Sequence, residues 1–377
     1  MSVTMFECGF GDGFLLEEYV TRPLLVDFGV YFSPKVDKYK NVISKVGGKT
    51  NKDFLLTHFH RDHFSGMLFW KNNLKKFSKE NHTFENVYIP AVNDVSVLRI
   101  LLLGSLGKKH TLLDFLTVFC RLGWRGLQCV GTGDIIGELT VLWPDAEPTA
   151  SGSIVDYAKK LWEQITRQNF AQSFSSLDAD IEKLHTYIDE MKNPEFDKQD
   201  EVLVLIREIQ KKLKEIESNQ NLLDAMDAIF IEEIGNEKIY LNQYDHICNI
   251  VFHNTKNALK GKRNILFTGD VETKDMKNIM LRTNPELKLH EEYDIIKITH
   301  HGTEHHHFDF CNLCRKNSET LFLIPNGRVS VFRASWRTSD KYNIAESAVC
   351  TTDLNRVVHG WGRTRDIYVP TEGEKRI

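Results

Sequence analysis

Hydrophobic and polar positions follow two different patterns along the chain. In the first 144 residues, short apolar runs bounded by glycine, proline or aspartate predict strands, and the first two of these form a hairpin. Helical spacing of apolar residues over 112–122 predicts a helix before the last strand. The predicted strands are 14–16, 24–26, 54–56, 86–90 and 138–144. Strands that alternate with helices predict an α/β layered fold.

The pattern becomes helical and strongly charged between residues 145 and 240. Apolar residues step by three and four from Leu177 to Met191, and again from Val202 to Ile216 after a break at Pro194. This spacing predicts two amphipathic helices. They form either an antiparallel hairpin or an exposed coiled-coil arm, and the sequence leaves both open. In the second form the helices would serve a homodimer or a protein partner.

Strand character returns in the last third of the chain, at 247–252, 264–268, 294–299 and 320–324. One interrupted domain explains this return better than three independent domains. We therefore predict that 1–144 is the first half of an α/β domain, that 145–240 is a helical insertion, and that 241–377 is the second half.

Composition narrows the class of protein. The chain has 377 residues, 41% hydrophobic and 27% charged, which is typical of a globular protein with a real core. A net charge of −4 argues against a globally basic nucleic-acid binder and leaves room for a local basic groove. The N-terminus lacks signal-peptide features, and no apolar run reaches the roughly 18 residues of a membrane span. With seven scattered cysteines, these features predict a cytoplasmic protein that contacts no membrane.

Histidines are concentrated in two windows, with eight of the 15 in 58–63 and 300–307. The first window follows an apolar strand and reads His58-Phe59-His60-Arg61-Asp62-His63. Imidazole and carboxylate groups are preferred ligands of zinc and similar divalent ions. Alternation along an extended turn points His58 and His60 the same way. Asp62 and His63 then begin a helix and can face a second ion.

This spacing resembles the signature of the metallo-β-lactamase fold superfamily. The resemblance implies an αββα sandwich that holds two divalent ions. It implies that Asp270, in Gly269-Asp270 after a strand, is shared by both ions. The first ion would bind His58, His60 and His246, although His246 also fits an ordinary turn histidine. The second would bind Asp62, His63 and one of His300 and His301.

Other motifs resemble the hydrolase domain of ComEC-type competence proteins and their soluble relatives. The resemblance covers about 1–144 and 240–370, does not cover 145–240, and is loose over 330–342. Asp12 and Asp27 would orient ligating histidines, although both also fit turn-forming aspartates. The matching motifs are Gly9-Phe10-Gly11-Asp12-Gly13, Asp27-Phe28-Gly29, Gly133-Asp134, His300 to Thr303, Asn326-Gly327 and Thr351 to Asp353.

The resemblance implies a phosphodiesterase or nuclease that uses two divalent metals and a bridging hydroxide. Zinc is the favoured metal, with manganese or iron as alternatives, and the substrate would be a nucleic acid or a nucleotide. Strand alternation turns His300 and His301 to opposite faces, so one would bind metal and the other would contact phosphate or protonate the leaving group. Asp62, Asp270, His300 and His301 would carry the chemistry.

Two further readings stay open. The same metals would serve a hydrolase of a lactone, thioester or amide, because fold does not settle function. Alternatively, the chain is a component whose 145–240 helices dock another protein. His305, His306 and His307 have no assigned role, and Cys311 and Cys314 fit ordinary helical cysteines or an accessory zinc site. Basic segments at 71–79 and 256–263 could contact phosphate or simply face solvent.

Overall fold

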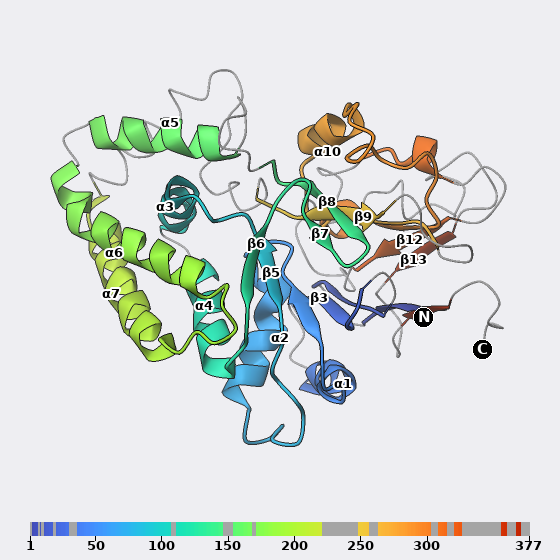
Figure 1. Cartoon of the computed structure of the whole chain (residues 1–377), viewed down its shortest axis with the longest axis horizontal. Helices are drawn as coiled ribbons and strands as arrows, with labels where there is room; N and C mark the ends of the chain where they lie inside the picture. The colour runs from blue at the N-terminus through green and yellow to red at the C-terminus, as the bar shows by residue number, and fades with distance from the viewer. Residues whose placement is uncertain are drawn as a thin grey trace.

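The computed structural model of the chain contains two mixed β-sheets that face each other, with helices on their outer sides (Figure 1). This arrangement confirms the predicted α/β class and is compatible with an α/β sandwich. The structure describes residues 2–6, 8, 11–17, 20–29, 36–106, 111–145, 154–167, 171–220, 248–255, 263–302, 308–314, 320–325, 356–359 and 367–370.

The first sheet has seven strands in the order β14-β1-β2-β3-β4-β5-β6. The predicted hairpin is present as β2 and β3, which pair antiparallel, whereas β3 to β6 run parallel. The last strand of the chain pairs with the first and closes one edge of the sheet. The strands are β1 (Ser2–Met5), β2 (Gly13–Leu16), β3 (Leu24–Phe28), β4 (Asp53–Leu55), β5 (Val87–Pro90), β6 (Leu127–Val130) and β14 (Ile367–Pro370).

The second sheet has seven strands in the order β13-β12-β11-β10-β9-β8-β7. Its members are β7 (Ile135–Ile136), β8 (Leu139–Trp143), β9 (Val251–Asn254), β10 (Ile265–Phe267), β11 (Ile295–Lys297), β12 (Leu321–Ile324) and β13 (Arg356–His359). The strand predicted at 247–252 begins later, at Val251. The residues before it bond to neighbouring loops instead of to a strand. Ile250 N donates to Thr57 O at 2.8 Å, and the Asn249 side chain donates to Thr268 O.

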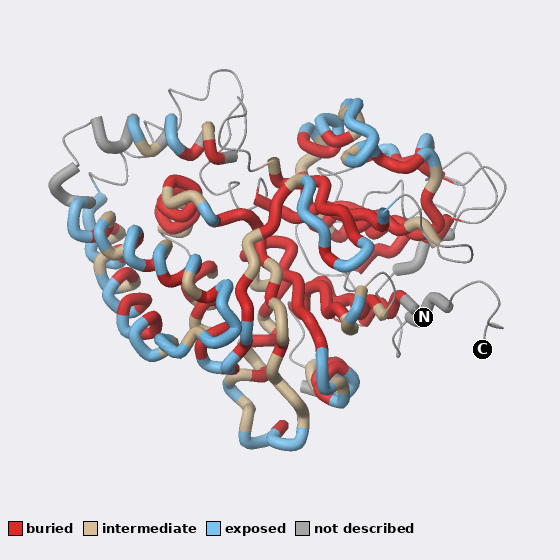
Figure 2. The backbone as a smooth tube through the Cα atoms, viewed as in Figure 1, coloured by how far each residue is buried: buried red, intermediate tan, exposed pale blue. Residues whose placement is uncertain are grey.

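Three apolar clusters hold the layers together. Phe14, Phe252 and Phe267 lie between the two sheets, with ring centroids 5.0–5.2 Å apart. A second cluster joins the outer face of the first sheet to its helices, and a third joins the second sheet to α10. Strands β1 to β5 and β8 to β12 are buried along most of their length where burial is described (Figure 2).

Helices flank both sheets. Among the described residues, no helix combines the length and the apolar character needed to cross a membrane. The helices that pack on the first sheet are α1 (Val36–Gly47), α2 (Arg61–Asn72), α3 (Val95–Gly104) and α4 (Thr111–Leu122). Helix α10 (Thr273–Met280) packs on the second sheet.

The middle of the chain forms α5 (Ile154–Arg167), α6 (Ala171–Glu190) and α7 (Gln199–Glu217). Helices α6 and α7 run antiparallel, because Tyr187 contacts Glu201 while Asp180 contacts Lys212. Their apolar stripes are buried against α3 and α4 of the same chain (Figure 1). The division of the chain at residues 144 and 240 stays a prediction.

We expect a matched pair of substitutions in α7 to report how this helix packs. Val202 is fully buried, whereas Val204 on the same helix is 54% exposed. Val202→Ala removes two buried carbons and should lower the free energy of unfolding by about 2 kcal/mol. Val204→Ala should change it by less than about 0.5 kcal/mol. Urea denaturation measures both, and equal losses would contradict the packing of α7 on the body.

Candidate metal centre

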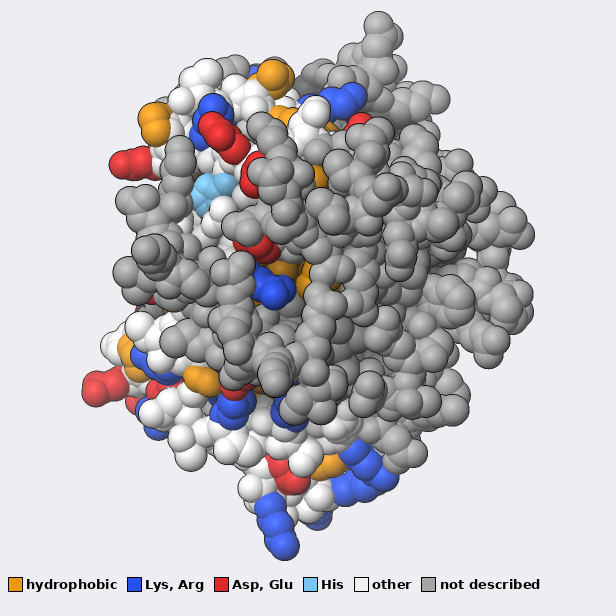
Figure 3. All heavy atoms as spheres, turned by 90° about the vertical axis from the view of Figure 1, so that its right-hand side faces the viewer, with side chains coloured by type: hydrophobic (Ala, Val, Ile, Leu, Met, Phe, Trp, Pro, Cys, Tyr) orange, Lys and Arg blue, Asp and Glu red, His pale blue; other side chains and the backbone are white. Residues whose placement is uncertain are grey.

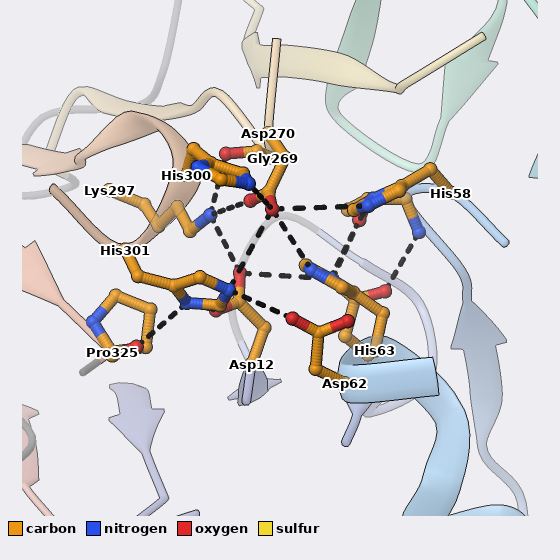
Figure 4. A network of polar contacts seen from close by, with 12 residues as sticks. Asp12, His58, Asp62, His63, Gly269, Asp270, Lys297, His300, His301 and Pro325 are labelled. Carbon is orange, nitrogen blue, oxygen red and sulfur yellow. Dashed lines mark hydrogen bonds and ion pairs between the residues drawn. The ribbon is translucent and has the colours of Figure 1, made fainter. Parts of the chain in front are cut away.

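The site lies where the ends of strands from both sheets meet. Asp27 is the second-to-last residue of β3, and His58 follows β4 in the first sheet. From the second sheet, Asp270 follows β10, and His300 and His301 follow β11. The carboxyl ends of parallel strands share one edge, so residues far apart in sequence converge there. Figure 4 shows Asp270 between His58 on one side and His300 and His301 on the other.

One carboxylate oxygen, Asp270 Oδ2, is the point on which the imidazoles converge. It lies 3.3 Å from His63 Nε2, 3.7 Å from both His300 Nε2 and His301 Nε2, and 3.9 Å from His58 Nε2. Two groups of three among the described residues could hold a metal ion, and both include His63. These groups are His58, His63 and Asp270, and Asp12, His63 and His301.

Hydrogen bonds on the far side of the rings assign the tautomers. His63 Nδ1 lies 2.8 Å from the carboxylate of Asp27, and His301 Nδ1 lies 2.8 Å from Pro325 O. Both partners can only accept, so each Nδ1 carries a hydrogen. The Thr57 hydroxyl donates to Asp27 at 2.7 Å and lies 3.3 Å from His58 Nδ1. In the neutral rings, the Nε2 lone pairs therefore face Asp270.

A lone pair facing a buried carboxylate requires a positive charge between them. His63 Nε2 and Asp270 Oδ2 are both buried and make no hydrogen bond among the residues that the structure describes. Although burial opposes ionisation, the neighbouring carboxylates raise the pKa of His63 well above its ordinary value. Burial opposes it at His301 too, but Asp270 and Asp12 raise the pKa of His301 to about 10.

At the carboxylates of Asp270 and Asp62, burial and neighbouring charges also act in opposite directions on the pKa. Burial acts to raise the pKa of Asp270, but His63 and Lys297 hold it well below the usual range. Burial likewise opposes the charge of Asp62, but the hydrogen bond from His301 and the charges of the neighbouring histidines together lower its pKa. Protons supply the positive charge in the metal-free protein. The same donor set fits a divalent cation, because imidazole Nε2 and carboxylate oxygens are the ligands that such cations take.

Asp62 and Asp12 lie on opposite sides of His301. Asp62 Oδ2 lies 3.2 Å from His301 Nε2, on the side that faces Asp270. Asp12 Oδ1 lies 3.1 Å from His301 Nδ1, and Asp12 Oδ2 lies 3.9 Å from His63 Nδ1. Asp12 thus approaches the Nδ1 atoms of both rings, on the side away from Asp270. These atoms carry hydrogens, so Asp12 lies behind the rings. By this geometry Asp62, His63, His301 and Asp270 offer the better candidate ligand set, and Asp12 and Asp27 contact its histidines from the far side.

The expectation that His300 and His301 face opposite ways is wrong. Both residues lie beyond β11 and have left-handed backbone, with φ of 42° and 54°. Strand alternation does not apply to such backbone, so two consecutive imidazoles approach the same oxygen. They differ in burial, because the side chain of His300 is 21% exposed and that of His301 is 2% exposed. Asp27 is also left-handed, with φ of 54°.

Close backbone contacts position Asp62 at the start of α2. Gly29 N donates to Asp12 O at 2.8 Å, and Asp12 N donates to Asp62 O at 3.1 Å. A Cβ at Gly29 would lie 1.4 Å from Asp62 O, so only glycine allows this approach. The Asp-x-Gly motif of the sequence therefore has two uses here: Asp27 orients His63, and Gly29 admits the backbone of α2.

Sequence reasoning missed two residues of the site, Asn249 and Lys297. Asn249 donates from Nδ2 to Thr268 O at 3.0 Å and accepts at Oδ1 from Asp270 N at 2.8 Å. It thereby holds the turn that carries Asp270. Lys297 is buried beside Asp12 and Asp270, which raise its pKa despite the opposing effect of burial. Its position inside the apolar run Ile295-Ile296-Lys297-Ile298 was a signal that could have been read.

The other predicted residues are placed only in part. His60 lies beside His58, with ring centroids 4.6 Å apart, and is half-buried; it belongs to neither three-residue group. Cys314 is buried, and its thiol donates to Phe310 O. The predictions that lie outside the described residues concern His246, His305, His306, His307, Asn326, Gly327, 330–342 and 351–353.

Removing the charge that orients His63 should weaken metal binding. In Asp27→Asn, the amide nitrogen cannot accept the hydrogen bond from His63 Nδ1, so the ring loses its fixed tautomer. We expect the affinity for Zn²⁺ to fall by about 10- to 100-fold. Competition with a chelating dye measures it. The control is Asp53→Asn, which changes a buried aspartate paired with Arg22 away from the site. Unchanged affinity in Asp27→Asn would contradict the role given to Asp27.

Comparisons with known proteins do not assign the chain to a family. No protein-family model matches the chain, and no curated protein matches it. The chemistry of the site has to be argued from the residues and geometry of the chain itself.

Proposed function

We propose that the chain is a metal-dependent hydrolase of the metallo-β-lactamase fold, similar to the ComEC-type hydrolase domain, and that it cleaves phosphodiester bonds. One observation carries the proposal: Asp270 Oδ2 lies within 3.9 Å of four imidazole nitrogens from two separate segments. The order of the two mixed sheets and the position of the site at their shared edge also fit that fold.

The proposed centre has two metal positions that share Asp270. His58 and His60 hold one, together with His246 if the resemblance extends to that residue. Asp62, His63 and His301 hold the other. When bound, divalent ions supply Lewis-acid activation of water and of the phosphoryl group. Zinc suits this donor set best, with manganese or iron as alternatives.

His301 and His300 have different proposed roles. His301 is buried, its Nδ1–H is held by Pro325 O, and its Nε2 faces Asp62 and Asp270, as the free nitrogen of a ligand would. His300 reaches the same Asp270 oxygen from a more exposed position. It can contact a phosphoryl oxygen of a bound substrate or give a proton to the leaving oxygen. The pair thus divides metal binding from substrate contact.

The charge of the centre favours an anionic substrate. Asp12, Asp27, Asp62 and Asp270 contribute four negative charges, and Lys297 contributes one positive charge. With neutral histidines, and before the bridging water loses a proton, two divalent ions then leave a net charge of +1. A phosphodiester is attracted to that charge, whereas a neutral lactone or ester gains little.

Two described members of the basic segments, Lys71 and Arg263, lie away from the site ends of their elements. Lys71 lies ten residues along α2 from Arg61, and therefore about 15 Å from the site end of that helix. Arg263 precedes β10 and lies at the opposite end of that strand from Asp270. On the face in Figure 3, several of the described lysine and arginine side chains lie next to acidic ones. These residues offer no continuous basic track to the site.

The test begins with metal analysis of the purified protein, followed by assays with Zn²⁺ or Mn²⁺. Substrates are bis-(p-nitrophenyl) phosphate, cyclic dinucleotides, DNA and RNA. We expect turnover of at least the small phosphodiester, and a loss of at least about 100-fold in His63→Ala and Asp270→Asn, because each removes a ligand. His185→Ala, which changes a histidine on α6 bonded to Asn93 O, should retain activity.

Three outcomes would redirect the proposal. If every phosphodiester stays intact with metal bound, the substrate class is wrong. Turnover of a lactone or thioester alone would move the chain to that class of hydrolase. If His63→Ala and Asp270→Asn are as active as the wild type, the activity does not belong to this site.

A further inference from the structure

A buried lysine lies inside the proposed metal centre. Lys297 is the last residue of β11 and is 1% exposed. Ile296 and Ile298 belong to the cluster on the outer face of the sheet, and Ile295 belongs to the cluster between the sheets. Alternation along the strand therefore directs Lys297 inward, to the edge where the two sheets meet. Figure 4 shows its ammonium group beside Asp270 and Asp12.

Each hydrogen of the ammonium group has an acceptor. Lys297 Nζ lies 2.6 Å from Gly269 O, 2.6 Å from Asp12 Oδ2 and 3.2 Å from Asp270 Oδ1. A lysine ammonium has three donors, so these three acceptors use all of them. No donor remains for a substrate. Lys297 therefore acts through the two aspartates and does not act as an acid.

The contact with Lys297 gives the two oxygens of Asp270 different surroundings. Oδ1 faces Lys297, whereas Oδ2 faces the four imidazoles. The backbone N–H of Asp270 is held by Asn249, which fixes the turn. The carboxylate cannot rotate without breaking a charge-assisted hydrogen bond in a buried site, where such bonds are strong.

The same ammonium keeps Asp12 out of the ligand set. Asp12 Oδ2 is paired with Lys297, and Asp12 Oδ1 lies behind His301. A fully buried carboxylate near two ligating histidines would otherwise compete for a cation. One lysine thus controls both carboxylates.

We propose that Lys297 is a positioning residue that limits Asp270 to one metal-binding oxygen, shared between the two metal positions, and holds Asp12 out of the ligand set. The inference rests on the proposed metal centre. Without Lys297, Asp270 Oδ1 and Asp12 become free to bind a cation. The ion at one position would then gain oxygen ligands. The ion at the other position would lose its share of Asp270 and bind more weakly.

The test compares metal binding in Lys297→Met with that in Lys52→Met. Lys52 is also 1% exposed, but its ammonium group contacts Lys49 O and Asn81 O, away from the site. Titration calorimetry and the visible spectrum of bound Co²⁺ are read in the full-length protein. We expect Lys297→Met to bind the second equivalent of Co²⁺ at least about 10-fold more weakly. Its Co²⁺ bands should also weaken as the coordination number rises, whereas Lys52→Met should match the wild type.

Lys297→Gln serves if Lys297→Met fails to fold, because glutamine keeps a donor without the charge; the same changes in Co²⁺ binding and spectrum are expected. Wild-type stoichiometry, affinity and spectrum in the folded Lys297 variant would overturn the inference. If the wild type binds two equivalents but cleaves no phosphodiester, the substrate proposal is wrong. The role of Lys297 is then still tested by the Co²⁺ affinity and spectrum of its variants. If the wild type binds no metal, both proposals are overturned.

Discussion

Buried negative charge is the constraint on which the site depends. Asp12, Asp27 and Asp270 are at most 1% exposed, and a carboxylate removed from water is costly unless donors or cations surround it. Donors come from several segments: Thr57 serves Asp27, and Lys297 serves Asp12 and Asp270. The remaining negative charge faces the imidazoles, which must be protonated or bound to a cation. Protonated imidazoles satisfy these groups, and the same atoms could hold a divalent cation.

Backbone strain is concentrated at the same place. The described non-glycine residues with left-handed backbone are Asp27, His300 and His301, and all three belong to the site. Each such residue costs about 1–3 kcal/mol and persists only where its surroundings fix it. Here the fixing contacts are the hydrogen bonds of Asp27 to Thr57 and of His301 to Pro325 O. The strain turns two consecutive histidines towards a single oxygen, which a regular strand cannot do.

The helical middle of the chain supports this geometry from a distance. Asp62 and His63 lie in the first turn of α2, and Arg61 Nη2 pairs with Asp114 of α4 at 2.5 Å. Helix α4 packs in turn against α7. The pair α6 and α7 is thus linked through α4 to the helix that carries two of the proposed ligands. This link gives the helices a structural use that does not require a partner protein.

Local pattern was enough to predict the α/β class, most strands of the two sheets, the amphipathic helices α6 and α7, and His58, Asp62 and His63 as candidate ligands, whereas Asp270 was indicated by the family resemblance. These features depend on the period of apolar residues and on side-chain chemistry, which can be read over a few neighbours. Local pattern could not predict the directions of His300 and His301 or the place of Asp12 behind the rings. It also could not predict the contacts of Asn249 and Lys297. Lys297 meets Asp12 across 285 positions of the chain, and the direction of His300 depends on a backbone angle that only its tertiary contacts stabilise. The sequence by itself determined which groups this protein has for binding a cation; the tertiary structure decided which of their atoms point inward, because burial leaves each charge only one set of partners.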